Sequence, residues 1–255
     1  MSYLRKTSVA MLAATMATAV AAPAAAASFT ITDISAVFSN PLKGSNVVVG
    51  AAGPTTTLSW GDPLTADQPR RSSYQFAGVA TPSQFNVPVG TTGLFDIGEF
   101  RHNNFPIPSG SGIKGATLDF TYTIEIPTGG ASVTRTSRAV FTHEETPNVA
   151  GQCPEGQSDP GNPCDDIVTI ITLALAEVET FVAGGLKFTL TDLGFTSGFT
   201  TMADGTQRWL TAEGQSNSSM IQAQMQVIPL PAAGWLLLSG LGALGFAGYR
   251  RRKET

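Results

Sequence analysis

His102 and His143 are the only histidines in this 255-residue sequence, and they limit the chemistry that the chain can perform. His143 begins the sequence His-Glu-Glu, which invites comparison with the HExxH helix of zinc proteases. The second histidine of that motif is absent, because Pro147 occupies its position and would break the required helix. A Ser-His-Asp triad is not indicated either, because no G-x-S-x-G nucleophile elbow occurs. We therefore expect no enzymatic activity and no cofactor.

His102, Asn103 and Asn104 form a polar group that ends two residues before Pro106. We expect these side chains at a strand end or in a loop, where an imidazole and two amides hydrogen-bond the backbone of a turning chain. The alternative is a ligand patch for carbohydrate together with Trp60, because sugars favour an aromatic face ringed by amides. The sequence leaves both interpretations open.

The two cysteines, Cys153 and Cys164, lie in a segment rich in glycine, proline and aspartate. In an oxidising compartment such a pair predicts a disulfide, and without clustered histidines it does not indicate a zinc site. Free structural thiols are the alternative. A bridge that closes a loop of about a dozen residues stabilises by about 3 kcal/mol in the chain-entropy model.

Carboxylates gather in and beside the cysteine segment, among them Asp159, Asp165 and Asp166. Calcium takes six to eight oxygen ligands, and a loop of this composition can wrap one ion. The spacing does not match an EF-hand, and a solvated acidic loop is the other interpretation. Apart from this calcium candidate, we expect no metal site.

The elements that must position these residues are extended segments, because no long stretch has a 3.6-residue hydrophobic period. Residues 117–126 alternate almost strictly, and the following turn at 127–130 leads to a second extended run at 132–141. This pattern predicts a β-hairpin. One face of its first strand carries five large side chains, Leu118, Phe120, Tyr122, Ile124 and Ile126.

Other short runs also predict strands, and turn residues separate them at intervals of about ten residues. The predicted strands are residues 29–32, 55–60, 167–172, 180–183, 186–191 and 218–227. Residues 173–180 have the composition of a short helix. We expect an all-β fold, a single β-sandwich or jelly-roll-like domain over residues 28–226.

The first 27 residues have the parts of a secretory signal peptide. Arg5 and Lys6 provide the positive start, an alanine-rich apolar stretch follows over 9–22, and small residues occupy 25–27. We therefore expect signal peptidase to cleave between Ala27 and Ser28.

The C-terminal segment, residues 227–255, has the order of a surface anchor. Pro229 and Pro231 hold the chain extended before an uncharged apolar run at 232–249. As a helix, these 18 residues span about 27 Å, close to the hydrocarbon thickness of a bilayer. The run predicts one transmembrane helix, followed by a basic stop that consists of Arg250, Arg251, Arg252 and Lys253.

The two ends together predict the topology. An N-terminal export signal and a C-terminal span place the body outside the cytoplasm and the basic stop on the cytoplasmic side. Removing residues 1–27 and 232–255 leaves nine basic and eighteen acidic side chains, a net charge of −9. An acidic body has no electrostatic footprint for nucleic acid.

The tail resembles the PEP-CTERM class of bacterial sorting signals, in its Val-Pro-Leu-Pro-Ala variant. The resembling residues are Val227, Ile228, Pro229, Leu230, Pro231, Ala232 and Ala233, with Ile228 where the tightest form of the motif has valine. The resemblance implies recognition by an exosortase, an integral membrane processing enzyme, with cleavage near the prolines. It also makes exopolysaccharide a candidate partner. The alternative is an ordinary type I membrane anchor without processing.

The body is similar, over about residues 58–166, to a family of secreted bacterial proteins named for a Thr-His-x-Asn motif and related to choice-of-anchor K domains. The resemblance is carried by LSWGDP at 58–63, SSYQF at 72–76, FRHNNFPI at 100–107, FTHEETPN at 141–148, the two cysteines and Asp165-Asp166. Arg101 stands where the motif has threonine. Because the molecular activity of that family is undefined, the resemblance implies a fold and a location only.

These observations predict an exported, exosortase-sorted protein of the cell envelope or extracellular matrix. Before sorting, its C-terminal helix would hold it in the membrane. A carbohydrate- or calcium-binding surface module is the alternative from another functional class.

Overall fold

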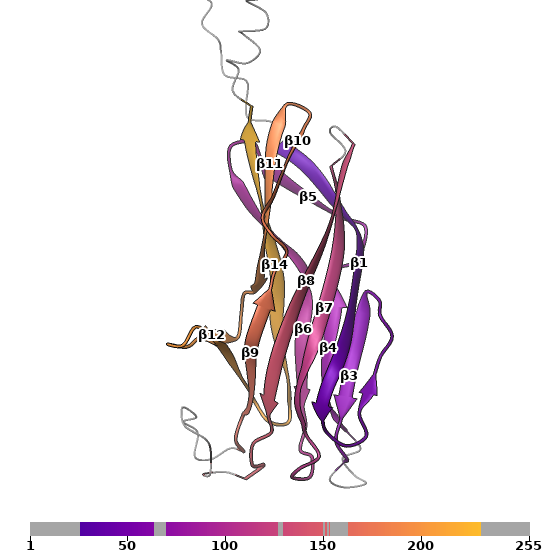
Figure 1. The fold of residues 1–255 in the computed structure, drawn as a ribbon, viewed down its shortest axis with the longest axis vertical. Coiled ribbons are helices and arrows are strands. Elements are labelled where there is room, and N and C mark those ends of the chain that lie inside the picture. The colour runs from indigo at the N-terminus through magenta and orange to yellow at the C-terminus, as the bar shows by residue number, and fades with distance from the viewer. Residues whose placement is uncertain are drawn as a thin grey trace, which may run out of the picture.

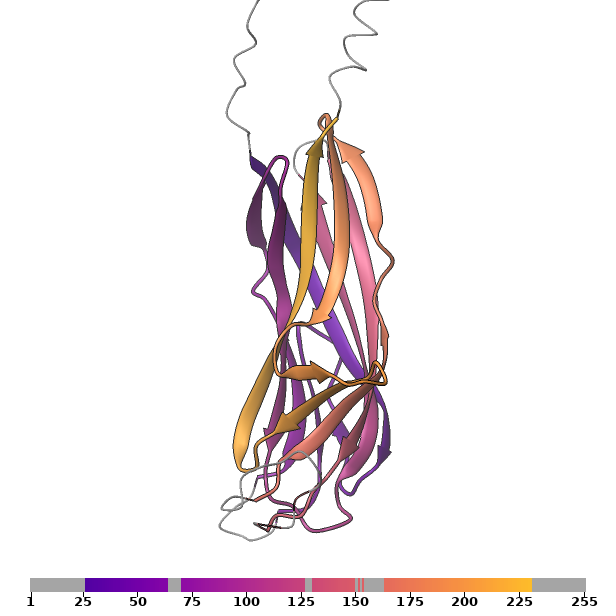
Figure 2. The same cartoon turned by 90° about the vertical axis from the view of Figure 1, so that its left-hand side faces the viewer.

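The computed structural model describes residues 26–63, 70–126, 130–149, 151, 153 and 163–230, which form an all-β structure of two curled sheets, consistent with a β-sandwich (Figures 1 and 2). None of these residues lies in a helix, so this part of the chain has no helix suited to crossing a membrane. The predicted span at 232–249 and all but the last two residues of the predicted signal peptide lie outside the described residues.

Each sheet has seven strands, and neighbouring strands in both sheets are antiparallel. In spatial order, sheet A consists of β12 (Phe199–Thr201), β13 (Gln207–Thr211), β9 (Asp166–Ala174), β8 (Ala131–Glu144), β7 (Ile113–Ile126), β1 (Ala26–Lys43) and β5 (Ser83–Pro88). Sheet B consists of β10 (Glu179–Ala183), β11 (Leu186–Phe195), β14 (Gln215–Pro229), β6 (Thr92–Asn104), β4 (Ser72–Gly78), β3 (Thr55–Trp60) and β2 (Val48–Val49).

The predicted hairpin is confirmed as β7 and β8, which pair continuously from Ile126 opposite Ala131 to Gly115 opposite Thr142. All five large side chains of the alternating run in β7 are buried. On the opposite face, Thr121 keeps partial contact with solvent and shares a hydrogen bond with Thr136 of β8. The period-2 pattern therefore identified the core-facing side of this strand.

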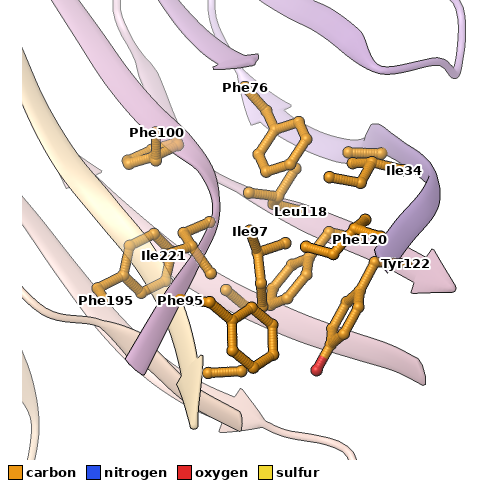
Figure 3. Close-up of a cluster of buried hydrophobic side chains, with 14 of the residues drawn as sticks. Ile34, Phe76, Phe95, Ile97, Phe100, Leu118, Phe120, Tyr122, Phe195 and Ile221 are labelled. Carbon is orange, nitrogen blue, oxygen red and sulfur yellow. The ribbon is translucent and has the colours of Figure 1, made fainter. Parts of the chain in front are cut away.

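Aromatic side chains from the two sheets meet in the core. Phe76 of β4 stacks on Phe120 of β7 at 6.4 Å between ring centroids, and both are buried (Figure 3). Phe95 of β6 also contacts Tyr122 of β7 across the core, but edge to face. Burying aromatic surface between two apolar sheet faces supplies most of the favourable free energy of such a fold.

The remaining predicted strands are also present. The run at 55–60 coincides with β3, and the runs at 29–32, 167–172, 180–183, 186–191 and 218–227 lie within longer strands or match them closely. No strand range was predicted for β2, β4, β5, β6, β12 and β13.

The short helix expected at residues 173–180 is wrong. This segment carries the chain from β9 in sheet A to β10 in sheet B. Side chains of β8 bind its backbone along the way: Ser137 accepts the N–H of Ala176, and Arg135 donates to its carbonyl. Because tertiary partners satisfy these backbone groups, the local preference for a helix is overridden.

Both termini of the described fold lie at one end of the molecule, the upper end in Figure 2. Ala26, at the start of β1, pairs with Pro88 at the end of β5. The turn after β5 then reaches β14, where Gly90 and Thr91 exchange backbone hydrogen bonds with Val227. We call this the terminal end, and the opposite end, where β6 and β8 finish and β9 begins, the distal end.

Candidate functional site

Strand alternation directs both histidines into the space between the sheets at the distal end. His102 is in phase with the buried Phe100 in β6, and His143 is in phase with the buried Phe141 in β8. Since side chains two residues apart in a strand share a face, both imidazoles must point inward. Asp166, the first residue of β9, is also fully buried.

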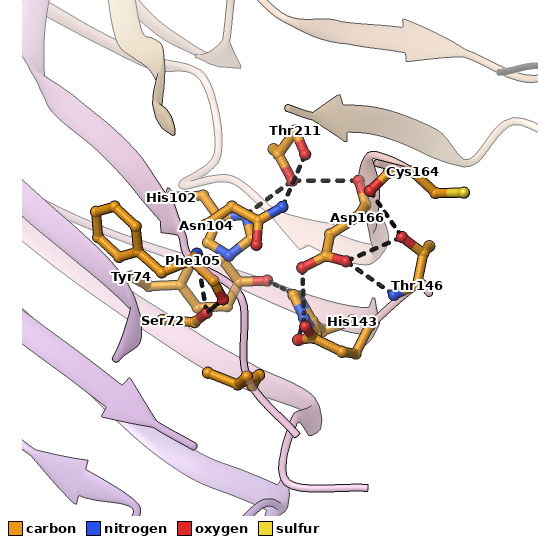
Figure 4. Close-up of polar contacts among 12 residues, drawn as sticks. Ser72, Tyr74, His102, Asn104, Phe105, His143, Thr146, Cys164, Asp166 and Thr211 are labelled. Carbon is orange, nitrogen blue, oxygen red and sulfur yellow. Dashed lines mark hydrogen bonds and ion pairs between the residues drawn. The ribbon is translucent and has the colours of Figure 1, made fainter. Parts of the chain in front are cut away.

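The two imidazoles meet although they belong to different sheets. Their ring centroids are 5.2 Å apart, and both side chains are buried. Trp60 of β3 stacks on His102 and contacts His143 with its ring edge, while Tyr74 of β4 contacts both. We call His102, His143 and Asp166, with the side chains that contact them, the distal cluster (Figure 4).

The hydrogen bonds of His102 determine which ring nitrogen carries its proton. Thr211 Oγ1 donates its single proton to the carbonyl of Asp166 at 3.1 Å. The same oxygen lies 2.8 Å from Nδ1 of His102 and must accept there, so Nδ1 carries the proton. The Nε2 lone pair of His102 is buried and has no hydrogen-bond partner among the described residues.

The tautomer of His143 follows from Tyr74. The Tyr74 hydroxyl lies 2.6 Å from Nδ1 of His143, and we assign the hydroxyl as the donor of this hydrogen bond. The proton of His143 is then on Nε2, which lies 3.4 Å from Oε2 of Glu145 and 3.6 Å from Oδ2 of Asp166. Each histidine therefore has its Nδ1 fixed by a hydroxyl and its Nε2 directed toward the middle of the cluster.

Asp166 is held rigidly by its neighbour Thr146. Its Oδ1 accepts the backbone N–H of Thr146 at 2.8 Å and the Thr146 hydroxyl at 3.3 Å. The other oxygen, Oδ2, has no hydrogen-bond partner among the residues that the structure describes, and it faces His143. One end of this carboxylate is thus anchored, and the other is directed into the cluster.

Two further acidic side chains approach Asp166. Carboxylate oxygens of Glu145, Asp166 and Glu213 lie within 4.8 Å of one another, and both oxygens of Glu213 are buried. Gly112 backs Glu145 closely, since a Cβ at that position would come within 2.9 Å of the Glu145 Cβ. The arrangement confines three carboxylates with little compensating positive charge.

Burial disfavours charge throughout the distal cluster. It raises the pKa of Asp166 to about 8, with further repulsion from Glu145, and it raises the pKa of Glu145 to about 7. Burial and the nearby Glu145 also raise the pKa of Glu213 to about 7. Burial lowers the pKa of His143 to about 4 and the pKa of His102 well below its usual value. Both histidines are therefore neutral near pH 7, and the contacts of His143 with its carboxyl neighbours are those of an uncharged N–H.

A surface hollow of about 570 Å³ borders the cluster at the distal end. Glu145 and Thr146 form part of its wall, together with Ile107 and Lys114. The Glu145 side chain is only 8% exposed. It thus stands between solvent in the hollow and the buried imidazole of His143.

The predicted carbohydrate patch has no exposed aromatic platform. Trp60, His102 and Asn104 are fully buried, and Asn104 donates to the carbonyl of Thr211 at 2.9 Å. Asn103 points to the other face of β6, where it joins Ser73 of β4 to Ser216 of β14. The structural interpretation, imidazole and amides at the end of a strand, describes these contacts, and a sugar would not reach the Trp60 ring.

The cysteine pair is confirmed as a disulfide between Cys153 and Cys164. The carbonyl of Cys164 accepts a hydrogen bond from Thr146, so the bridge is linked directly to the distal cluster.

Of the calcium candidates, Asp159 lies outside the described residues, and Asp165 precedes β9. Asp166 is buried in the distal cluster, where its Oδ1 accepts the backbone N–H of Thr146.

The predicted processing sites lie at the terminal end. Ala27 is buried in β1, and Ser28 donates a hydrogen bond to Asn86 of β5. The sorting motif begins inside the fold, since β14 continues through Val227 and Ile228 to Pro229, beyond the domain boundary expected at 226. Leu230 donates its N–H to the carbonyl of Gly185. Residues 231–233 and the basic residues 250–253 lie outside the described residues, so processing remains a prediction.

The sequence analysis considered His102 and His143 separately. It did not name the other residues of the cluster as candidate site residues; these are Tyr74, Glu145, Thr146, Thr211 and Glu213. One signal was available: the only two histidines both fall in phase with buried aromatic residues of alternating strands. What the alternation could not indicate is that the two strands face each other across the sandwich.

No family model matches the chain, and none of the curated proteins matches it either. The functional argument therefore rests on the residues and on their geometry.

Proposed function

We propose that this chain is an exported protein of the bacterial cell surface or extracellular matrix, with a non-catalytic β-sandwich body that a C-terminal signal directs to its place. An N-terminal signal peptide takes it across the membrane. The tail, with its proline motif, apolar span and basic stop, holds it there until an exosortase-type enzyme processes it.

The observation that carries the proposal is the order of features in the tail, and the geometry of the terminal end supports it. β14 ends at Pro229, within the proposed sorting motif, and proline cannot donate a hydrogen bond to a further strand residue. The motif therefore begins in the last residues of β14 and continues past the end of that strand. A processing enzyme would act on the part of the motif that follows Pro229.

The burial of the two histidines supports a non-catalytic body. A general base must reach the proton of a substrate within hydrogen-bond distance. Both imidazoles are enclosed by Trp60, Tyr74 and neighbouring strands, and neither exposes surface to a substrate from solvent.

The disulfide fits an extracytoplasmic location, because such bridges persist in oxidising compartments.

Intact-mass measurement of the protein from the cell envelope tests the proposal. We expect a mature chain that begins at Ser28 and lacks the residues beyond the motif at 227–233. Pro231→Ala should block the C-terminal cleavage without disturbing the sandwich, because Pro231 follows the last strand. Pro108→Ala, a proline in a loop of the distal end, is the matched control and should leave processing unchanged.

A mature mass that still includes Arg250 to Thr255 would reduce the tail to a plain membrane anchor. A mass that retains residues 1–27 would argue against export altogether.

A further inference from the structure

The distal cluster contains a lone pair that no proton donor reaches. Nε2 of His102 is buried, uncharged and without a hydrogen-bond partner among the described residues, and its Nδ1–H is already committed to Thr211. Buried acceptors are rarely left in this state, and each such case needs a physical explanation. A neutral imidazole whose Nδ1–H is fixed by an oxygen is also the form in which histidine binds metal ions.

The ligand atoms needed for a metal ion already converge at this point. Nitrogen atoms of His102 and His143 and an oxygen of Asp166 lie within 4.8 Å of one another. Asp166 directs its partnerless Oδ2 toward Nε2 of His143, and Thr146 holds its other oxygen in place. Figure 4 shows these side chains approaching from β6, β8 and β9. A contraction of up to about 1.5 Å would bring the three atoms to the spacing of ligands around one tetrahedral ion.

The acidic side chains beside Asp166 also favour the binding of a cation. Glu145 and Glu213 add two carboxylates beside Asp166, and among the described groups Lys114 is the cation that acts on Glu145. A divalent ion would be bound by these carboxylate oxygens and would give the orphaned atoms of His102 and Asp166 a partner.

We propose that His102, His143 and Asp166 bind one divalent transition-metal ion of the zinc class. Two imidazoles with a carboxylate suit zinc, whereas calcium takes oxygen ligands only. Glu145, 3.4 Å from Nε2 of His143, is placed to complete the coordination. When the ion binds, the proton of His143 moves from Nε2 to Nδ1, where it is donated to the Tyr74 hydroxyl, and the neutral imidazole binds the ion through Nε2.

The ion would have a structural role. Its ligands are buried, as in closed structural zinc sites, and they come from both sheets, with His102 on sheet B and the other two on sheet A. One bound ion would therefore tie the two sheets together at the distal end, beside the disulfide.

A metal titration tests the inference. The full chain, purified in detergent and depleted of metal with EDTA, is titrated with Zn²⁺ in competition with a chromophoric chelator. We expect one saturable equivalent per chain and a higher melting temperature when Zn²⁺ is present. Co²⁺ should occupy the same site and give the visible absorption of a low-coordinate ion with nitrogen ligands.

Variants assign the site. His102→Gln and Asp166→Asn should each weaken Zn²⁺ binding by at least about tenfold and remove the increase in melting temperature. Glu125→Gln, an exposed carboxylate of β7 outside the cluster, is the control and should bind as the unmodified chain does. Asp166→Asn keeps an oxygen that can accept from Thr146, so it serves if His102→Gln does not fold.

Three results would overturn the inference: no saturable Zn²⁺ binding at one equivalent, Zn²⁺ binding equal in the unmodified chain and in Asp166→Asn, or preferential binding of Ca²⁺ that Glu213→Gln abolishes and His102→Gln does not.

Discussion

Tyr122 shows how one residue can belong both to the apolar core and to a polar network. Its ring packs among the core aromatics, while its hydroxyl donates a hydrogen bond to Asp192 of β11. Ser137 of β8 donates to the other oxygen of Asp192 at 2.6 Å, and the guanidinium of Arg135 lies 3.8 Å away. Asp192 belongs to sheet B, and its buried carboxylate is therefore satisfied by groups from sheet A across the core.

Tyr122→Phe should destabilise the protein although it keeps the ring. It removes one donor from the buried Asp192, and a lost partner of this kind costs about 1–3 kcal/mol. Urea denaturation followed by intrinsic fluorescence measures the change in unfolding free energy. Thr123→Ser, on the outer face of the same strand, is the control, and an equal effect in both variants would mean that the hydroxyl contributes nothing specific.

At the scale of elements, the hairpin of β7 and β8 is central to sheet A, since β7 pairs with β1 on its other side and β8 pairs with β9. Its inward face contacts the aromatic side chains of sheet B. Substitutions on the two faces should therefore differ sharply in their effect on stability.

Phe120→Ala should lower the unfolding free energy by about 3–5 kcal/mol, because it removes a fully buried ring and leaves a cavity. Thr121→Ser, one residue further along and partly exposed, should change it by about 0.5 kcal/mol or less. Chemical denaturation of both variants measures the two changes in unfolding free energy. Small and equal effects would show that this strand is not part of the core.

The disulfide is the other element whose contribution can be measured directly. Replacing Cys153 and Cys164 together by serine should cost about 2–4 kcal/mol, because the reduced chain gains loop entropy when it unfolds. Thermal unfolding of the double variant beside the oxidised protein measures the loss. In the native secreted protein, neither thiol should react with an alkylating reagent before reduction, and rapid labelling would contradict the bridge.

At the scale of the whole molecule, the two ends of the sandwich differ in what they contain. β1 begins and β14 ends at the terminal end, while the distal cluster, the surface hollow and the disulfide lie at or near the other end. In the proposed function, the anchor would hold the terminal end toward the membrane, and the distal end would face outward.

Labelling on intact cells tests this orientation. Ser109→Cys introduces an exposed thiol at the distal hollow and should react with a membrane-impermeant maleimide. Glu254→Cys, in the predicted cytoplasmic or removed tail, should not be labelled. Reaction of Ser109→Cys only after cell lysis would contradict exposure at the cell surface.

Local patterns in the sequence determined a large part of the fold. Period-2 alternation predicted the strand at 55–60, the hairpin of β7 and β8, and the inward face of β7, because the direction of a strand side chain depends only on its position along that strand. The cysteine pair likewise predicted the disulfide from composition and spacing. Shorter or less regular strands such as β5 and β12 have no comparable local signal and were missed.

The distal cluster was decided by tertiary structure alone. His102 pairs within sheet B and His143 within sheet A, and the packing of one sheet on the other brings their rings to 5.2 Å. Asp166 was assigned to the acidic cysteine loop, yet its position at the start of β9 directs it into the core. Which inward-facing residues meet depends on strand order and on sheet packing, and these are set by the whole apolar core rather than by the residues around each histidine.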